Sequence, residues 1–584
     1  MNGGTIDNLG LKGIKITGST TDGNGDEGEG GLVGLMQAGN LYDDYVTGSI
    51  TGGALYVGGL VGENVTGSIS NSYSTATVDA LQETWGGGLA GMNGGSIDNS
   101  YATGKVSAYN AGGLVGQDNG VIAASYATGI ANGSDVAGGL VSTLFPVGTS
   151  QISDSYATGN VTMTSQYGFA GGLVGGINYS TSGGILIDNS YASGTVTGAS
   201  DSDVGGLVGQ VYAFNGAARS ILNDSASGAV IGGIGSDAGG LIGANIGATS
   251  VESDDATGSV TVASGSAKVG GLIGYNNSTG SGIQSSYATG AVSAGVDSDA
   301  GGLIGDNTGT VGTFYSYATI TSSYASGTVT GGGGSSVGGL VGYGYLFIVQ
   351  SSWATGNVTG NGPDTDSNDS YVGGLVGRAD EPAPASGAVS GSYATGAVVD
   401  TGSADVGGLV GLNTIIISDS YADSSVTVTN AAAANVGGLV GDNNLTSPGN
   451  IFASYAAGAV SLTGSPTASV GGLIGYASSN ASSLMQDCYW DTSTTGITNL
   501  SQGVGNITGA AGVTGLTTAQ FQAGLPTGFD SSIWGESPTI NGGLPYLLAS
   551  PPAQKRPERA TKPAGVSAMR ALESEWIYPW RDGR

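Results

Sequence analysis

The chain has 584 residues, among them 115 glycines, one cysteine, no histidine, 43 acidic residues and 13 basic residues. Without histidine there is no Ser-His-Asp or Cys-His nucleophile and no histidine zinc site, and a lone Cys488 cannot close an internal disulfide. A net charge of −30 repels nucleic acid and anionic lipid, so we expect neither as a partner. No run of about 18 apolar residues offers a membrane span.

An internal repeat accounts for the glycine. The string Gly-Gly-Leu followed by Val, Ile or Ala occurs fifteen times between Gly30 and Ile474, at spacings of 25 to 37 residues. Between copies lie a second string, of which residues 100–106 (SYATGKV) are typical, and one loop-like stretch of variable length. Both strings are short and glycine-rich, and β-branched residues alternate beside them, which favours strands. Short strands at such a period predict an all-β fold, a parallel β-solenoid of about 15 coils with one coil per repeat.

Each repeat is expected to encode a corner of the coil and an apolar side chain that fills the interior. At Gly112, Gly113 and Gly116 we expect glycine to provide a positive φ and close backbone approach, while Leu114 enters the interior. In the second string, alternation places Ser, Ala and the glycine equivalent to Gly129 inside and the tyrosine equivalent to Tyr126 outside. We expect this tyrosine column to be half exposed, because one repeat has Asp255 there and another, at 224–228, skips the position.

The chain opens in the middle of a repeat, because residues 2–8 (NGGTIDN) match residues 93–99 (NGGSIDN). We therefore expect the chain to be the C-terminal part of a longer protein or to begin at an internal Met. A start within a longer protein would also explain why the first residues do not form a signal peptide. We assign residues 1–480 to the solenoid.

The composition changes after the last repeat. We assign residues 481–550 to a C-terminal cap with one short helix, which begins at Thr517 or Thr518 and ends at 524–526. Residues 551–584 hold seven of the thirteen basic residues and five prolines, and we predict a disordered basic tail there.

The sequence offers only weak candidates for a calcium site, in residues 364–369 and in residues 22–29. Asp364, Asp366 and Asp369 are spaced like the first half of a calcium loop, but Asp369 stands where the loop needs Gly and Leu375 where it needs Glu. A loose calcium site and a solvated acidic loop both fit this pattern. No catalytic residue and no other cofactor is predicted, and the acidic residues are scattered over loops without the concentrated pair that glycoside hydrolysis requires.

The repeats resemble a known family. Residues 112–116 (GGLVG) with 125–129 (SYATG), repeated over roughly residues 2–480, resemble the GLUG-motif repeats of bacterial surface proteins. The segments YWD (489–491), GLTTAQF (515–521) and GGLPY (542–546) are similar to the close of repeat regions in filamentous-haemagglutinin-like secreted proteins. The resemblance implies an extracellular or bacterial cell-surface location and part of an adhesin, with a host-cell or matrix receptor or glycan as partner. Secretion machinery would be a further partner if the full-length protein carries a signal.

Three functions are therefore weighed. The first is a non-catalytic surface rod that presents variable acidic loops for attachment to cells or matrix. GLUG repeats also accompany immunoglobulin A-specific metallopeptidases, but their His-Glu-x-x-His zinc helix is absent from this chain. The alternatives are a carbohydrate-active or carbohydrate-binding β-helix and an ice-binding solenoid. Ice binding would use a threonine column that Ser193, Ser326 and Ala457 interrupt: Thr103, Thr128, Thr158, Thr289, Thr355 and Thr395.

Overall fold

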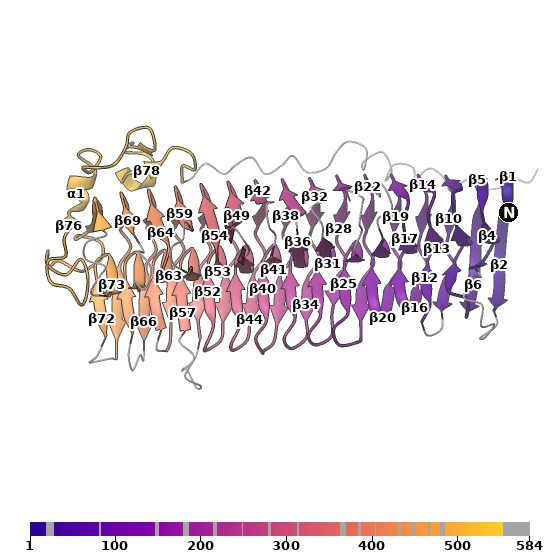
Figure 1. The fold of residues 1–584 in the computed structure, drawn as a ribbon, viewed down its shortest axis with the longest axis horizontal. Coiled ribbons are helices and arrows are strands. Elements are labelled where there is room, and N and C mark those ends of the chain that lie inside the picture. The colour runs from indigo at the N-terminus through magenta and orange to yellow at the C-terminus, as the bar shows by residue number, and fades with distance from the viewer. Residues whose placement is uncertain are drawn as a thin grey trace, which may run out of the picture.

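The computed structural model describes residues 1–18, 28–80, 83–145, 151–178, 186–213, 219–247, 249–277, 282–311, 315–361, 370–382, 387–402, 404–429, 434–444, 450–464, 468–478 and 485–552. Their regular elements are almost all short strands, stacked into a rod whose long axis crosses the strands (Figure 1). Three sheets of parallel strands run along the rod, which confirms the predicted parallel β-solenoid. Among the described residues, no helix is long and apolar enough to cross a membrane.

One coil illustrates the repeat. β17 (Val115–Asp118) follows the Gly-Gly-Leu corner, β18 (Val121–Ala123) comes next, β19 (Tyr126–Ala127) carries the tyrosine, and β20 (Ala131–Gly138) leads to the following Gly-Gly-Leu. Each strand pairs in parallel with its equivalent one coil further on, as Tyr126 does with Tyr156. Most coils split the last strand into two, such as β24 (Val161–Met163) and β25 (Phe169–Gly171).

Equivalent strands of successive coils form the three sheets. A 15-stranded sheet, from β4 (Val33–Met36) to β73 (Ile474–Ala477), takes one strand from each Gly-Gly-Leu copy. A 16-stranded sheet, from β1 (Asn2–Asp7) to β74 (Met485–Gln486), contains β18 and its equivalents. The third sheet holds the tyrosine strands and the strands that lead to the next corner. Residues at one position of the repeat therefore form a column along the rod, with neighbours about 4.8 Å apart.

The interior is divided into two cores. Leu114, Val115, Ile122 and Ala127 are fully buried in the main core, together with their equivalents in other coils. A second, narrower core lies between the two strands that follow the tyrosine, as Val196 and Val204 show. We call this second layer, formed by pairs such as β24 and β25, the arm. Its strands lie along the lower edge of the rod in Figure 1.

The glycines of the Gly-Gly-Leu corner are required by crowding. A Cβ added to Gly112 would lie 1.8 Å from the carbonyl oxygen of Val115, and one added to Gly113 would lie 2.0 Å from that of Gly139. A Cβ added to Gly116 would lie 2.6 Å from the carbonyl oxygen of Gly91, and one added to Gly129 would lie 2.0 Å from that of Gly104. The expected close approach is therefore confirmed, but the expected positive φ is wrong, because none of these four glycines has a left-handed backbone.

Left-handed backbone instead occurs at the residue before each Ser-Tyr-Ala string. There φ is 47° at Asn99, 48° at Ala124 and 49° at Asp154. Asn and Asp tolerate this conformation better than other residues with a Cβ, which explains their frequency at the position. The buried serine that follows completes the corner: the Ser125 hydroxyl donates to the carbonyl of Ala123 at 2.7 Å, and the Ser125 N–H donates to Ser155 Oγ at 3.1 Å.

Variable stretches occur at two places in each coil, whereas the sequence predicted one. The first lies between the 15-stranded and 16-stranded sheets, where residues 119–120 connect β17 to β18. The second lies at the tip of the arm, where residues 198–202 connect β29 (Val196–Thr197) to β30 (Asp203–Gly205). Insertions at these places leave the register of the sheets unchanged, because only loop backbone is lengthened.

The C-terminal residues cover both the last coil and one side of the rod. β76 (Val513–Leu516) pairs with β75 (Cys488–Asp491), and α1 (Thr518–Phe521) follows it. The N-cap of α1 is Thr517, as expected, with a capping box to Gln520, but the helix ends at Phe521, earlier than expected. β77 (Trp534–Gly535) and β78 (Tyr546–Leu547) form a short antiparallel pair. Of the predicted tail, 551–584, all but residues 551–552 lie outside the described residues.

Candidate functional site

A column of stacked aromatic rings runs along the outside of the rod, as predicted. Tyr101, Tyr126 and Tyr156 are stacked with ring centroids 4.8 Å apart and are half-buried. Near the C-terminus the expectation of half exposure is wrong: Tyr421 and Tyr455 are fully buried. They are buried because Phe521, Phe529 and Trp534 of the cap pack against them: the ring pairs are Tyr421–Trp534, Tyr455–Phe521, Tyr455–Phe529 and Tyr455–Trp534.

Two rungs of this column lack a ring. Ser225 pairs with Tyr191 on one side and with Asp255 on the other, and Asp255 pairs with Tyr287. The repeat at 224–228 therefore does not skip the tyrosine position, because Ser225 occupies it. The interruption separates a run of six stacked tyrosines that ends at Tyr191 from a second run that begins at Tyr287.

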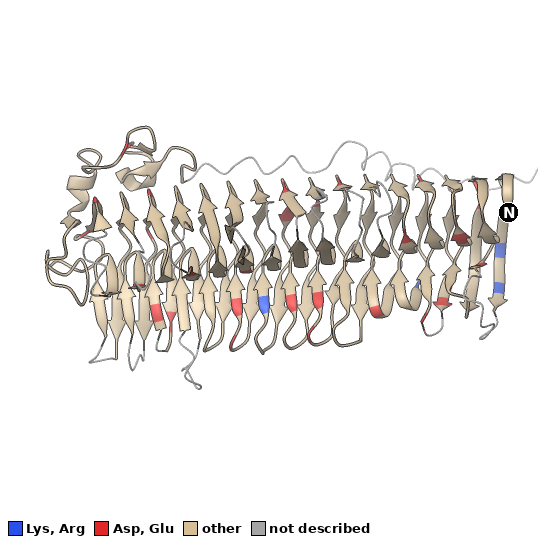
Figure 2. Ribbon diagram, viewed as in Figure 1, with Lys and Arg blue, Asp and Glu red and all other residues tan. Residues whose placement is uncertain are grey.

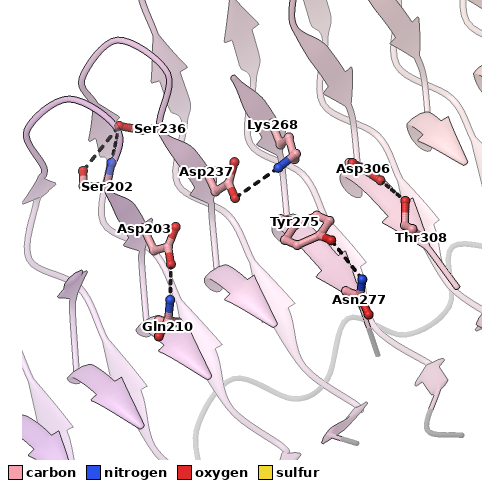
Figure 3. Close-up of polar contacts among 10 residues, drawn as sticks. All are labelled: Ser202, Asp203, Gln210, Ser236, Asp237, Lys268, Tyr275, Asn277, Asp306 and Thr308. Carbon is pink, nitrogen blue, oxygen red and sulfur yellow. Dashed lines mark hydrogen bonds and ion pairs between the residues drawn. The ribbon is translucent and has the colours of Figure 1, made fainter. Parts of the chain in front are cut away.

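Interacting charges are concentrated on two columns beside the Gly-Gly-Leu corner (Figure 3). The first column comes from the residue two before the first corner glycine, and it runs in register through Asp203, Asp237, Lys268 and Asp299. The second column comes from the residue after Gly-Leu-x-Gly and includes Gln210, Tyr275 and Asp306. We call Asp203, Asp237, Lys268, Asp299 and Asp306 the acidic corner. Figure 2 shows how few basic residues accompany the acidic ones along the rod.

Side chains from the two columns contact each other across the corner. Gln210 Nε2 donates to Asp203 Oδ2 at 2.7 Å. Lys268 Nζ lies 3.5 Å from Asp237 Oδ2 and 4.1 Å from the centroid of the Tyr275 ring. The two columns therefore form one surface, in which a single lysine lies among four carboxylates.

Burial in this corner shifts the proton affinities. Burial, followed by the nearby charge of Asp237, raises the pKa of Asp203 to about 7. Burial also raises the pKa of Asp306 to about 7 and that of Asp299 to about 6. For Lys268, burial lowers the pKa, but the negative charges of Asp237 and Asp306 outweigh it and the pKa is raised. At neutral pH the corner can therefore attract cations and exchange protons.

The acidic corner was missed by the sequence analysis, which expected no concentrated carboxylates. Asp203, Asp237 and Asp299 are 34 or more residues apart in sequence, and only the register of the coils brings them together. A usable signal was present, because each of them stands two residues before a Gly-Gly-Leu. Reading one position of the repeat down successive coils would have predicted the cluster.

The remaining predicted site residues have mixed outcomes. Asp364, Asp366 and Asp369 lie outside the described residues. Within the part of the chain that the structure describes, no three His, Cys, Asp or Glu side chains are grouped so that they could hold a metal ion. The threonine column faces outward, with Thr103, Thr128 and Thr158 exposed and Thr395 half-buried.

Coils with a Gly-Gly-Leu strand, a buried Ser-x-Ala strand and an outer tyrosine define an all-β repeat protein built as a parallel solenoid. The family model of the GLUG motif matches residues 53–79 and 86–107, each of which covers one Gly-Gly-Leu strand and the tyrosine strand that follows it. The chain is thus a β-solenoid repeat protein that carries the GLUG motif. No curated protein and no solved structure matches it significantly.

Proposed function

We propose that the chain is the non-catalytic rod of an extracellular or cell-surface bacterial adhesin, which presents variable acidic loops for attachment to host cells or matrix. One observation carries the proposal most directly: large apolar side chains are exposed at the tip of the arm. Tyr167 is 68% exposed, Ile234 is 56% exposed and Val296 is 49% exposed, each in a loop between two arm strands. Exposed apolar side chains on polar loops are typical of surfaces that bind other molecules.

The architecture supports the same function. Successive coils hold their register through backbone hydrogen bonds, so the rod keeps its shape while loop length and sequence vary. An array of this kind separates the binding loops from one another at regular intervals. Many weak contacts along one rod then add to a strong attachment.

Binding of the purified protein to epithelial cells and to immobilised matrix proteins tests the proposal. We expect binding above an albumin control and at least a fivefold loss in the triple variant Tyr167→Ser, Ile234→Ser and Val296→Ser. The matched control is Ile231→Ser, because Ile231 is 45% exposed but lies on a strand of the arm. Absence of binding, or an equal loss in the control, would refute the proposal.

A carbohydrate-active β-helix is the second candidate, favoured by the acidic corner. Carboxyls with pKa values of about 7, such as Asp203 and Asp306, are suited to general acid and base catalysis near neutral pH. Incubation with a panel of polysaccharides, followed by a reducing-end assay, distinguishes the two. Hydrolysis that Asp203→Asn and Asp306→Asn abolish would favour the enzyme.

A further inference from the structure

A separate cavity lies on the arm near its N-terminal end. It has a volume of about 610 Å³ and is lined by residues of β11 (Thr77–Ala80), β16 (Val106–Gly112) and β20 (Ala131–Gly138) and by the loop residues beside them. β16 and β20 are marked on the lower right of Figure 1. This volume is in the range of cavities that bind small ligands.

The lining is rich in hydrogen-bonding groups. Asp79 pairs with Ser107, and Ser107 pairs with Asn132, so three successive rungs present a carboxylate, a hydroxyl and an amide. Glu83 adds a second carboxylate to the lining, and Ser134 and Ser165 add two hydroxyls. The lining residues include no Lys or Arg, so an anionic ligand would find no opposite charge.

Tyr109 adds an aromatic ring that is held in place. Its hydroxyl is hydrogen-bonded to Asp135, which lies one coil further on. A ring fixed in this way offers an apolar surface at low entropic cost. The lining of the cavity thus combines an aromatic ring with acceptors and donors for several hydroxyl groups.

We infer that this cavity binds a neutral, hexose-containing glycan, an inference that rests on the proposed adhesive function and names its partner. Sugar hydroxyls donate to Asp79 and Glu83 and accept from Asn132 and the serines, while the C–H groups of a sugar ring pack on Tyr109. A bound metal is a poorer fit, because the described residues hold no group of three side chains suited to a metal. A sialylated glycan is also a poorer fit, because its carboxylate would face Asp79 and Glu83.

Calorimetric titration of the full chain with lactose, cellobiose, chitobiose and 3′-sialyllactose tests the inference. We expect at least one neutral disaccharide to bind and 3′-sialyllactose to bind at least tenfold more weakly than lactose if lactose binds. Tyr109→Ala and Asp79→Asn should each weaken binding at least tenfold. Tyr42→Ala is the control, because Tyr42 is an exposed tyrosine near the N-terminal end of the rod that does not line the cavity. Binding to none of the neutral sugars, or unchanged binding in Tyr109→Ala, overturns the inference.

The same variants in the cell-binding assay separate this inference from the proposed function. Cell binding without sugar binding would contradict the cavity assignment and leave the adhesive role in place. Sugar binding without cell binding would contradict the adhesive role and leave the cavity assignment in place.

Discussion

The indole N–H of Trp534 donates to Asp419 Oδ1 at 3.3 Å, although 115 residues separate them in the chain. Asp419 stands at the left-handed corner position of its coil, with a φ of 47°. Nearby, the hydroxyl of Tyr455 donates to the carbonyl of Pro545 at 2.6 Å. The C-terminal residues therefore fold back along the rod and seal its aromatic column in addition to covering the last coil.

Trp534→Ala should detach this part of the cap. The buried indole contacts Tyr421, Tyr455 and Phe529, so its removal should cost about 3–5 kcal/mol of local stability. Hydrogen exchange of the Leu548 amide, which donates to the carbonyl of Ile533 at 2.9 Å within the cap, measures the loss. Ile533→Ala is the control, because Ile533 is 37% exposed and should change exchange little. Equal protection in wild type and Trp534→Ala would show that the cap does not depend on this side chain.

Asp118 should make the rod less stable as pH rises. It is fully buried, and burial raises its pKa to about 7. A folded-state pKa above the unfolded value means that the folded chain binds more protons between about pH 4 and pH 7, so stability is greatest at acid pH and falls through this range. Urea unfolding should therefore show a higher midpoint at pH 5 than at pH 8.

The variant Asp118→Asn isolates this contribution. Asn93 stands at the equivalent position and donates to Asp118 Oδ1 at 2.7 Å, so an amide fits the column. The variant should raise the urea midpoint at pH 8 and so reduce the difference between the midpoints at pH 5 and pH 8. Asp98→Asn changes an exposed carboxyl and should leave this difference unchanged. If the midpoints at pH 5 and pH 8 differed more in Asp118→Asn than in the wild type, the destabilising role of buried Asp118 at high pH would be contradicted.

Ala124→Gly should stabilise the rod. Ala124 has a left-handed φ of 48°, which costs a residue with a Cβ about 1 kcal/mol relative to glycine. Thermal unfolding should show a modest rise in melting temperature. Ala127→Gly, three residues further on in the main core, is expected to lower the melting temperature because it removes a buried methyl group. A fall in melting temperature in both variants would contradict the left-handed backbone at Ala124.

Filling the interruption in the aromatic column should also stabilise the rod. Ser225→Tyr places a ring next to Tyr191, Asp255→Tyr places one next to Tyr287, and together the new rings stack on each other. Each stacked pair is worth about 0.5–1.5 kcal/mol. Urea unfolding of the single and double variants forms a double-mutant cycle. The gain in the double variant should exceed the sum of the single gains, and a deficit would show that the two rungs do not accept rings.

The repeat pattern alone was enough to predict the fold. Strict alternation in the Ser-Tyr-Ala string predicts that Ser100 and Ala102 face inward and Tyr101 outward, and they do. This succeeds because strand alternation is local and needs no knowledge of neighbouring coils. The role of Gly112 was predicted only in part: close packing was recognised, but the left-handed corner lies at the residue equivalent to Asn99.

The sequence by itself determined the parallel solenoid, the period of its coils and the outward aromatic column, because backbone pairing between identical repeats leaves one consistent arrangement. Only the tertiary structure decided which distant residues became neighbours. Asp203, Asp237, Lys268 and Asp306 share one corner because variable loops are accommodated outside a constant register. Tyr421 and Tyr455 lost their exposure because the cap folded back onto them, a contact between unlike segments that no repeat pattern encodes.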